Sequence, residues 1–439
     1  MAKQENQSNG VQRGLKDRHI SMIAIGGCIG TGLFMTSGGA IHDAGALGAL
    51  LAYAIIGAMV FFLMTSLGEM ATYLPVSGSF STYATRFVDP SLGFALGWNY
   101  WFNWVITVAA DVTIAAQVIQ YWTPLAGMPA WAWSCLFLLI IFGLNALSVR
   151  VYGESEYWFA LIKVVTVIIF IGIGLLTILG IMGGEFVGFD TFTKGGGPIL
   201  GDGLGGSLLT ILGVFLVAGF SFQGTELIGI TAGESENPER AVPKAIKQVF
   251  WRILLFYVLS IAVISAIIPY TDPLLLNESE SVSQSPFTIV FDRVGIAFAA
   301  SVINAVILTS LLSAANSGIY TTSRMLYSMA EDKQAPRFLA KLNKTTKLPI
   351  VALFTTFIIV LAVIILAQFK SDIVFTLLNI IGSLVIVIWA ASILAQIRLR
   401  LAIKKQNKDP KEVLPYKAPF YPLGPIIVII ALLFLFGGN

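Results

Sequence analysis

The chain has 439 residues, of which 56% are hydrophobic and only 12% charged, and its mean hydropathy is +0.82. A globular domain has about 25% charged residues, so this composition excludes a water-soluble fold, and the long apolar runs exclude the short strands of a membrane β-barrel. A net charge of +3 indicates no nucleic-acid partner. The sequence predicts an all-α polytopic membrane protein.

Windows of about 20 apolar residues predict eleven membrane spans. A polar, basic segment precedes them and lacks the apolar core of a cleavable signal peptide, so we expect none. The last span is short, and no twelfth is seen. The predicted spans are 20–41, 46–71, 94–121, 129–149, 156–182, 205–232, 248–269, 287–322, 349–368, 373–398 and 422–436.

The lysines and arginines predict the orientation of these spans. If the N-terminus is cytoplasmic, 23 of the 27 basic residues lie in cytoplasmic segments or span ends, and only Lys194, Arg293 and Lys370 lie outside. The remaining one, Lys163, falls inside the fifth span. Because cytoplasmic loops carry an excess of lysine and arginine, we expect the N-terminus inside the cell.

Two of the spans contain sequences that do not favour a regular helix. The first span has four glycines in seven residues, at positions 26, 27, 30 and 32, and each glycine costs about 1 kcal/mol relative to alanine. The sixth span reads GFSFQGTE over 219–226 and places a carboxylate, Glu226, near its middle. Small residues also serve close helix packing, which is the alternative interpretation of the glycines.

The two interruptions lie five spans apart, and an odd number of spans inverts the second unit. Interrupted helices at matching positions of inverted repeats indicate the binding site of a secondary transporter. The N-terminal end of a half-helix suits a carboxylate and the C-terminal end suits an ammonium group, so an amino acid fits both. The predicted organisation is a cytoplasmic segment 1–19, a first repeat 20–182, a second repeat 205–398, a basic loop 399–421 and an incomplete span 422–439.

Several segments resemble those of a known family. They are Leu15–Phe34, Ser66–Ser81, Gly93–Trp104, Gly219–Pro238, Gln248–Tyr257, Ile268–Pro273, Asn304–Tyr327 and Tyr421–Pro425. In these segments the chain is similar to the lysine-specific permeases of the amino acid transporter family, within the amino acid–polyamine–organocation superfamily. The resemblance implies a five-plus-five inverted fold with discontinuous first and sixth helices and two further C-terminal helices, of which only one is seen here.

Ionisable residues inside the spans are functional candidates because each costs at least about 2.5 kcal/mol at mid-bilayer. Lys163 is either a residue that binds and releases the coupled proton, because desolvation disfavours its charged form, or a permanent charge paired with a carboxylate or carbonyls. The resemblance implies that Lys163 supplies the positive charge that a bound cation supplies in sodium-coupled relatives. Glu226 is expected to contact the substrate, to carry a proton or to cap the break. Asp111 is expected to face either the ligand cavity or Lys163.

Two carboxylates at the cytoplasmic ends of spans are candidates for gates. Glu234 is either a gate or a solvated helix end. Glu69 is expected to form an inner gate, or an ordinary interfacial ion pair, with Arg86 or Arg18.

The breaks supply the expected contacts with the substrate backbone. The backbone N–H groups of the first break are expected to bind the carboxylate, and carbonyls of both breaks the α-ammonium group. One of the two phenylalanines of the second break is expected to close over the substrate. The residues are Ile29, Gly30, Thr31 and Gly32 in the first break and Phe220, Ser221 and Phe222 in the second.

The sequence therefore predicts a transporter of the cell membrane that imports a basic L-amino acid, first of all L-lysine, by proton symport with alternating access. A permease or exchanger for another amino acid, such as histidine, arginine or an aromatic residue, is the alternative, and an amino acid sensor or channel is the alternative of a different class. No nucleophile–base pair or phosphate loop indicates an enzyme. We expect no metal or cofactor, the proton being the coupling ion, and the two cysteines indicate no disulfide framework. The expected partners are the amino acid, protons and the lipid bilayer, and the oligomeric state is not predicted.

Overall fold

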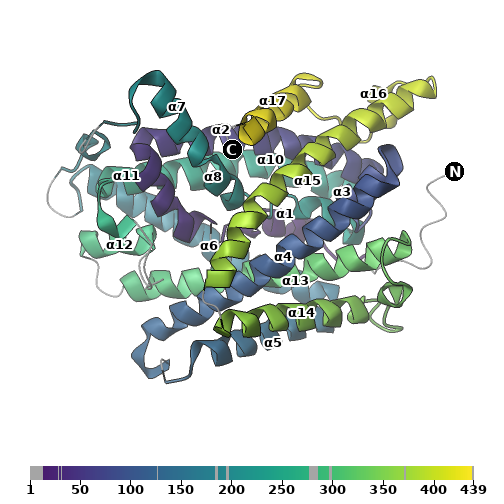
Figure 1. Cartoon of the computed structure of the whole chain (residues 1–439), viewed down its shortest axis with the longest axis horizontal. Coiled ribbons are helices and arrows are strands. Elements are labelled where there is room, and N and C mark those ends of the chain that lie inside the picture. The colour runs from purple at the N-terminus through teal and green to yellow at the C-terminus, as the bar shows by residue number, and fades with distance from the viewer. Residues whose placement is uncertain are drawn as a thin grey trace.

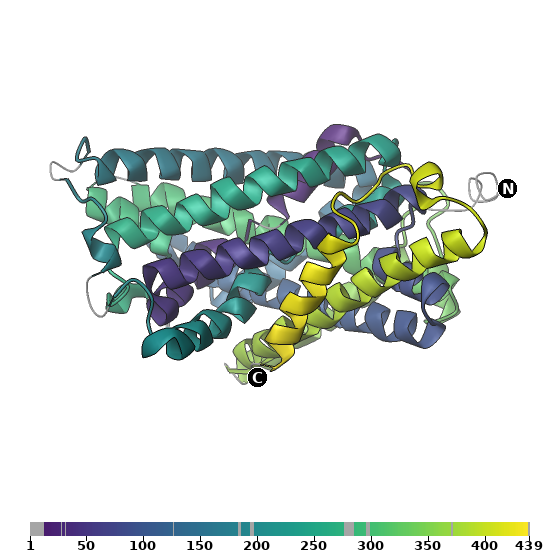
Figure 2. The ribbon, with the colours of Figure 1, turned by 90° about the horizontal axis from the view of Figure 1, so that it is seen from above.

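The computed structural model describes residues 13–27, 29–30, 32–125, 127–182, 186–193, 197–275, 285–295, 299–369 and 372–437. The regular elements in these ranges are helices, and the long ones run side by side roughly along the long axis of the molecule (Figures 1 and 2). Eight of the described helices are long and apolar enough to cross a membrane, and shorter apolar helices occupy Leu255–Ile267 and Leu423–Leu433. The prediction of an all-α polytopic membrane protein is confirmed.

The first half of the chain contains α1 (Asp17–Gly26), a π-helical turn (Gly32–Thr36), α2 (Ser37–Tyr73), α3 (Ser79–Phe87), α4 (Pro90–Val118), α5 (Ala130–Leu147) and α6 (Val149–Ile178). The second half contains α7 (Gly203–Gly213), α8 (Phe215–Ser221), α9 (Leu227–Thr231), α10 (Pro238–Arg252), a π-helical turn (Ile253–Val258), α11 (Leu259–Ile267), α12 (Pro286–Val294), α13 (Ala299–Glu331), α14 (Ile350–Phe369), α15 (Asp372–Lys405), α16 (Pro410–Val413) and α17 (Leu423–Gly437).

Local sequence signals explain where two of the long helices begin. Asp89 precedes Pro90, and its carboxylate accepts a hydrogen bond from the backbone N–H of Ser91 at 2.8 Å, which starts α4 and lowers the pKa of Asp89. Ser148 caps α6 in the same way, since its Oγ accepts from the N–H of Val151 at 3.1 Å. Ser148 is also the whole connection between α5 and α6.

Two predicted span boundaries differ from the structure at glycines with positive φ. Gly45 has φ +76° within α2, so residues 37–44 form the second half of the first span and the chain turns at Gly45 into the second span. Gly295 has φ +74° and ends α12. The prediction of one long span at 287–322 is therefore wrong, because α12 is a separate short helix and α13 continues beyond the predicted end to Glu331.

The centre of the bundle is the packing of α4 along α13, while α1 packs on α6 and α10. The first contact is close because Gly318 of α13 has no side chain: a Cβ there would lie 2.4 Å from Val108 and 2.8 Å from Trp104 of α4. Trp104 is 2% exposed and belongs to the main hydrophobic core. This pair of helices lies beside the broken helices, since α13 also contacts α1 and α9.

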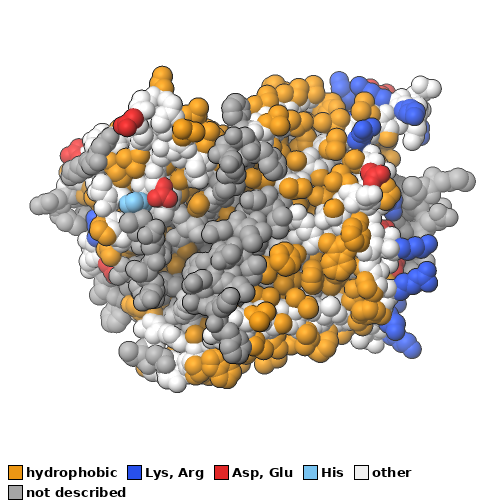
Figure 3. Space-filling model, in the orientation of Figure 1, with side chains coloured by type: hydrophobic (Ala, Val, Ile, Leu, Met, Phe, Trp, Pro, Cys, Tyr) orange, Lys and Arg blue, Asp and Glu red, His pale blue; other side chains and the backbone are white. Residues whose placement is uncertain are grey.

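The outer surface divides by chemistry. Hydrophobic side chains cover the flanks of the bundle, and lysines and arginines gather at the end where the C-terminal end of α15 and the N-terminal end of α14 lie (Figure 3). This basic end includes the exposed residues Lys404, Lys405 and Lys408. An apolar band with one basic end is the arrangement that a bilayer requires.

Candidate functional site

The two predicted helix breaks are present and lie against each other. The helix α1 ends at Gly26 and regular structure resumes at Gly32, while α8 ends at Ser221 and α9 begins at Leu227. A Cβ on Gly32 would lie 2.3 Å from the Cα of Ser221, and a Cβ on Gly27 would lie 3.2 Å from the carbonyl oxygen of Gly224. Glycines in the first break therefore allow the backbone of the second break to approach it.

Lys163 of α6 holds the end of the half-helix α1. Its Nζ donates a hydrogen bond to the carbonyl oxygen of Gly26 at 2.9 Å, and the side chain is fully buried. The last carbonyls of a helix lack intrahelical partners and carry partial negative charge, so an ammonium group is favoured there. The structure shows the predicted pairing of Lys163 with a backbone carbonyl. The role of Lys163 in proton coupling stays a prediction.

The carboxylate of Glu226 accepts hydrogen bonds within and beside the second break. Its Oε2 accepts a hydrogen bond from the backbone N–H of Gly224 at 3.0 Å, and its Oε1 accepts one from the hydroxyl of Tyr100 at 3.1 Å. The side chain is 3% exposed. This is the capping arrangement that was one of the three interpretations of Glu226, and contact with a substrate or proton transfer stays a prediction.

The side chains of the second break point in different directions. Phe222 is fully buried, and its ring lies 4.3 Å from that of Tyr257, whereas Phe220 is partly exposed. The hydroxyl of Tyr257 donates to the carbonyl of Ser221 at 2.7 Å, and Tyr53 and Ser221 hydroxyls lie 2.9 Å apart. Of the two phenylalanines, Phe220 is thus the more exposed one, and closure of either over a substrate stays a prediction.

In the first break, Ile29 and Gly30 are described and Thr31 lies outside the described residues. The N–H of Ile29 donates to the carbonyl of Gly26 at 3.2 Å, and the carbonyl of Gly30 accepts from Phe34 at 3.1 Å. The backbone near the break is therefore only partly helical, and the role of its N–H groups in binding a carboxylate stays a prediction.

Asp111 lies on the face of α4 that meets the second break. Asn103, Thr107 and Asp111 follow at intervals of four residues and so share one face of the helix. The side-chain amide of Gln223, inside the second break, contacts Asn103 Oδ1 and lies 3.4 Å from Thr107 Oγ1. Asp111 is 2% exposed and continues this polar row by one turn.

Glu234 is a buried ion-pair partner and not a solvated helix end. It is fully buried, its Oε1 accepts from Arg324 Nε at 3.0 Å, and its Oε2 accepts from the Tyr320 hydroxyl at 2.7 Å. Its backbone carbonyl accepts from the N–H groups of Gly14 and Leu15 at 3.1 Å each. Glu234 therefore joins α13 to the segment that leads into α1, which is a suitable place for a gate.

Glu69 is paired, but the predicted partners were wrong. Its Oε1 accepts from Arg400 Nε at 2.7 Å, and its Oε2 accepts from the backbone N–H of Ala418 at 2.8 Å. Arg18 instead pairs with Glu154 and Arg86 is exposed. Arg400 lies 331 residues away in sequence, beyond any local signal.

Arg400 and Glu69 also affect aromatic residues of the loop that follows α15. The guanidinium of Arg400 stacks 3.8 Å from the ring centre of Tyr421. Burial, assisted by the negative charge of Glu69, raises the pKa of Tyr416 to about 12. The basic loop after α15 is thus fixed to the end of α2 by an ion pair and aromatic contacts.

The sequence reasoning missed one buried carboxylate, Glu156. It is fully buried in α6, where its oxygens accept from Ser313 Oγ at 2.7 Å and from Asn316 Nδ2 at 2.6 Å, both on α13. Asn316 Oδ1 in turn accepts from Asn145 of α5 at 2.8 Å. The available signal was the spacing, since Glu156 lies seven residues before Lys163 and so shares its face of the helix.

Lys163, Glu226 and the polar row of α4 form one region around the breaks. Two half-helix ends, a buried ammonium group and buried carboxylates surround the contact between the broken helices, and such ends bind charged groups of small zwitterions in membrane transporters. Ionisable groups at membrane depth mark substrate and ion pathways.

Comparison with known proteins agrees with this geometry. Residues 19–438 match the family model described as amino acid permease. The chain is 54% identical to the lysine-specific permease LysP of Lactococcus lactis subsp. cremoris (97% of this chain, 84% of the relative) and 50% identical to LysP of Escherichia coli (99% and 88%). It is also 50% identical to the histidine permease HisP of L. lactis (97% and 87%). The chain belongs to the amino acid permease family.

Proposed function

We propose that this permease imports a basic L-amino acid, with L-lysine as the first candidate, by proton symport and alternating access. The observation that carries the proposal is the contact of the two broken helices, with Lys163 bonded to the end of α1. The similarity to two lysine-specific permeases supports lysine as the substrate.

In this proposal the substrate lies between the two breaks. Its carboxylate binds N–H groups of residues 29–32, and its α-ammonium group binds carbonyls near Phe220 and Ser221. The Ser221 carbonyl already accepts from Tyr257, but a carbonyl has two lone pairs and can accept a second donor. Glu226 and Asp111 provide negative charge for the distal ammonium group of lysine.

Lys163 couples the proton to the movement of α1. While protonated, it binds the negative end of the half-helix and holds α1 against α6. Loss of the proton weakens this hold, so that α1 can separate from α6 and open the site to the other side. The proton and the amino acid then cross in the same cycle.

The proposed orientation follows from the basic end of the molecule. Lysines and arginines gather there (Figure 3), and positive residues are retained on the cytoplasmic side of a cell membrane. The same end contains the contacts of Glu69 with Arg400, which supports a cytoplasmic position for the proposed gate.

Histidine is the second candidate substrate. The similarity to a histidine permease equals that to one of the lysine permeases, at 50% identity. The polar row of α4 and the carboxylate of Glu226 suit either basic side chain. Competition by unlabelled lysine, histidine and arginine against the same labelled substrate separates these alternatives.

The test is uptake of radiolabelled L-lysine into proteoliposomes that contain the full chain, with and without an inward proton gradient. We expect accumulation above equilibrium only with the gradient, and its loss when a protonophore is added. Uptake that does not depend on the gradient would indicate exchange or facilitated diffusion instead of symport. Absence of lysine uptake by folded protein that accumulates histidine would assign the second candidate.

A further inference from the structure

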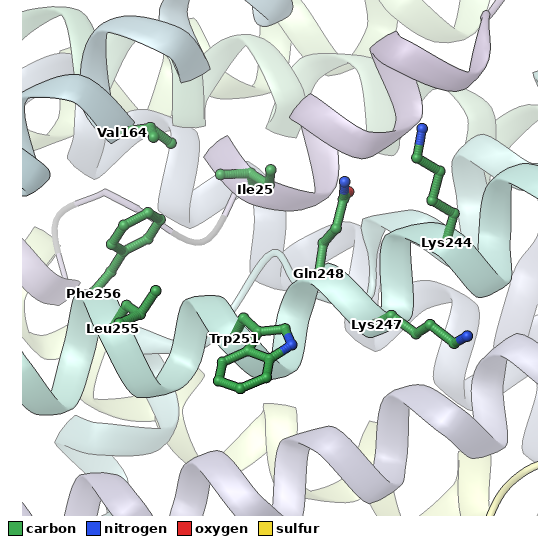
Figure 4. Close-up of a pocket in the computed structure, with 8 residues that line it drawn as sticks. All are labelled: Ile25, Val164, Lys244, Lys247, Gln248, Trp251, Leu255 and Phe256. Carbon is green, nitrogen blue, oxygen red and sulfur yellow. The ribbon is translucent and has the colours of Figure 1, made fainter.

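A groove opens on the side of the bundle, beside the end of α1. It has a volume of ≈ 330 Å³ and lies between α1, α6 and the helix formed by α10 and its following π-helical turn (Figure 4). The residues that line it are Ile25, Val164, Lys244, Lys247, Gln248, Trp251, Leu255 and Phe256.

One wall of the groove is a continuous stripe on a single helix face. Lys244, Lys247, Trp251 and Leu255 follow at intervals of three or four residues, which places them in a row along the helix. Trp251 is 61% exposed and Leu255 is 42% exposed, and both lysines are exposed. In a membrane protein, large apolar side chains with this exposure face lipid.

Charge and apolar surface separate along the groove. The two lysines lie at one end, and Leu255, Phe256 and Val164 lie at the other (Figure 4). The nearby Arg240, one turn before Lys244, pairs with Asp17, with Nε and Oδ2 3.7 Å apart. An occupant that fits needs an anionic head and an apolar tail in the same molecule.

We propose that the groove binds an anionic phospholipid, with its phosphate beside Lys244 and Lys247 and an acyl chain along Trp251 and Leu255. Lysines next to the membrane surface attract anionic headgroups, and tryptophan favours the interface between headgroup and hydrocarbon. A free amino acid fits poorly, because Gln248 is the one uncharged polar side chain among the lining residues.

The floor of the groove connects the lipid to the proposed transport machinery. Ile25 directly precedes Gly26 and Val164 directly follows Lys163, and the hydrogen bond between Gly26 and Lys163 holds α1 on α6. An acyl chain in the groove therefore packs against the joint that has to open. This consequence for the rate rests on the proposed function, whereas the lipid site itself does not.

Native mass spectrometry of the purified full chain tests the site, with phosphatidylglycerol and phosphatidylcholine added separately. We expect preferential binding of phosphatidylglycerol, an affinity about tenfold lower in K244A/K247A, and a lower affinity for both lipids in W251A. The matched control is K404A/K405A, which removes two exposed lysines of the same basic end outside the groove.

Two results would overturn the proposal. One is an equal loss of phosphatidylglycerol binding in K404A/K405A and in K244A/K247A. This result would show that general surface charge, and not the groove, attracts the lipid. The other is displacement of the lipid by soluble glycerol phosphate together with unchanged binding by W251A, which would assign a phosphate site without a tail. Because these readouts do not involve transport, they stand even if lysine is not the substrate.

Discussion

Lys163 donates a hydrogen bond to the carbonyl oxygen of Gly26, 137 residues earlier in the chain. The bond joins the middle of α6 to the last residue of α1 before the helix breaks. An ammonium group in this position replaces the missing helical donors at the end of α1 and also places a titratable charge at the joint.

Replacing Lys163 with alanine removes both functions. We expect K163A to lose gradient-driven accumulation of the substrate, while K404A, which removes an exposed lysine, behaves like the unchanged protein. The measurement is initial uptake and steady-state accumulation in proteoliposomes with equal amounts of folded transporter. Accumulation by K163A at the normal level would disprove the coupling role.

A substitution at Gly26 tests the close approach of α1 and α6 without changing any charge. A Cβ on Gly26 would lie 2.5 Å from the Cβ of Ala160 and 3.0 Å from its Cα. We expect G26A to displace α1, lengthen the bond to Lys163 and reduce uptake more than tenfold. Adding A160G removes the nearer of the two clashing atoms, so the double variant should regain part of the activity. No difference between G26A and G26A/A160G would contradict this packing.

The length of the apolar runs and the glycine content were sufficient to predict the helical class and both breaks, because they depend on local composition. Gly32 and Ser221 could also be placed near one another, since inverted repeats bring matching spans together. The split at Gly295 was missed because the apolar residues on both sides of Asp292, Arg293 and Gly295 were merged into one span, whereas the left-handed conformation of Gly295 ends α12 there.

The pairings of the charged groups were harder to predict. Glu69 meets Arg400 and Glu234 meets Arg324 through contacts between distant helices, for which spacing along the chain gives no signal. Glu156 has neutral hydrogen-bond donors on α13, and serines and asparagines in a span carry no distinctive pattern. Hydropathy thus located the membrane-spanning segments but could not identify which buried polar groups meet.

Glu226 can act by capping the break or by its charge, and two substitutions separate these roles. E226Q keeps an oxygen for the N–H of Gly224 but removes the negative charge, whereas Y100F removes one hydrogen bond worth about 1 kcal/mol and leaves the charge. We expect E226Q to lower lysine uptake at least tenfold and Y100F to lower it only a few-fold. Normal uptake by E226Q would restrict the role of this carboxylate to capping.

The buried pair of Glu234 and Arg324 should behave as one unit. Removing one partner of a buried ion pair leaves an uncompensated charge and costs about 3–5 kcal/mol, so R324M and E234Q should each lower thermal stability and the yield of folded protein. In E234Q/R324M both charges are absent, and the loss should be smaller than the sum of the single losses. Additive losses in melting of the purified proteins would show that the two charges are not coupled.

Arg400 and Arg86 provide a matched comparison for the contact of Glu69. R400A removes the partner of a buried carboxylate and releases the loop held at Ala418 and Tyr421, whereas R86A removes an exposed arginine. We expect protease to cleave the loop after α15 at least several-fold faster in R400A, with R86A unchanged, since Lys411 and Lys417 of this loop are substrates for trypsin. E69Q should accelerate cleavage less than R400A, because the neutral amide oxygen can still accept the backbone hydrogen bond of Ala418. Equal cleavage of R400A and the unchanged protein would mean that the aromatic contacts of the loop hold it without the ion pair.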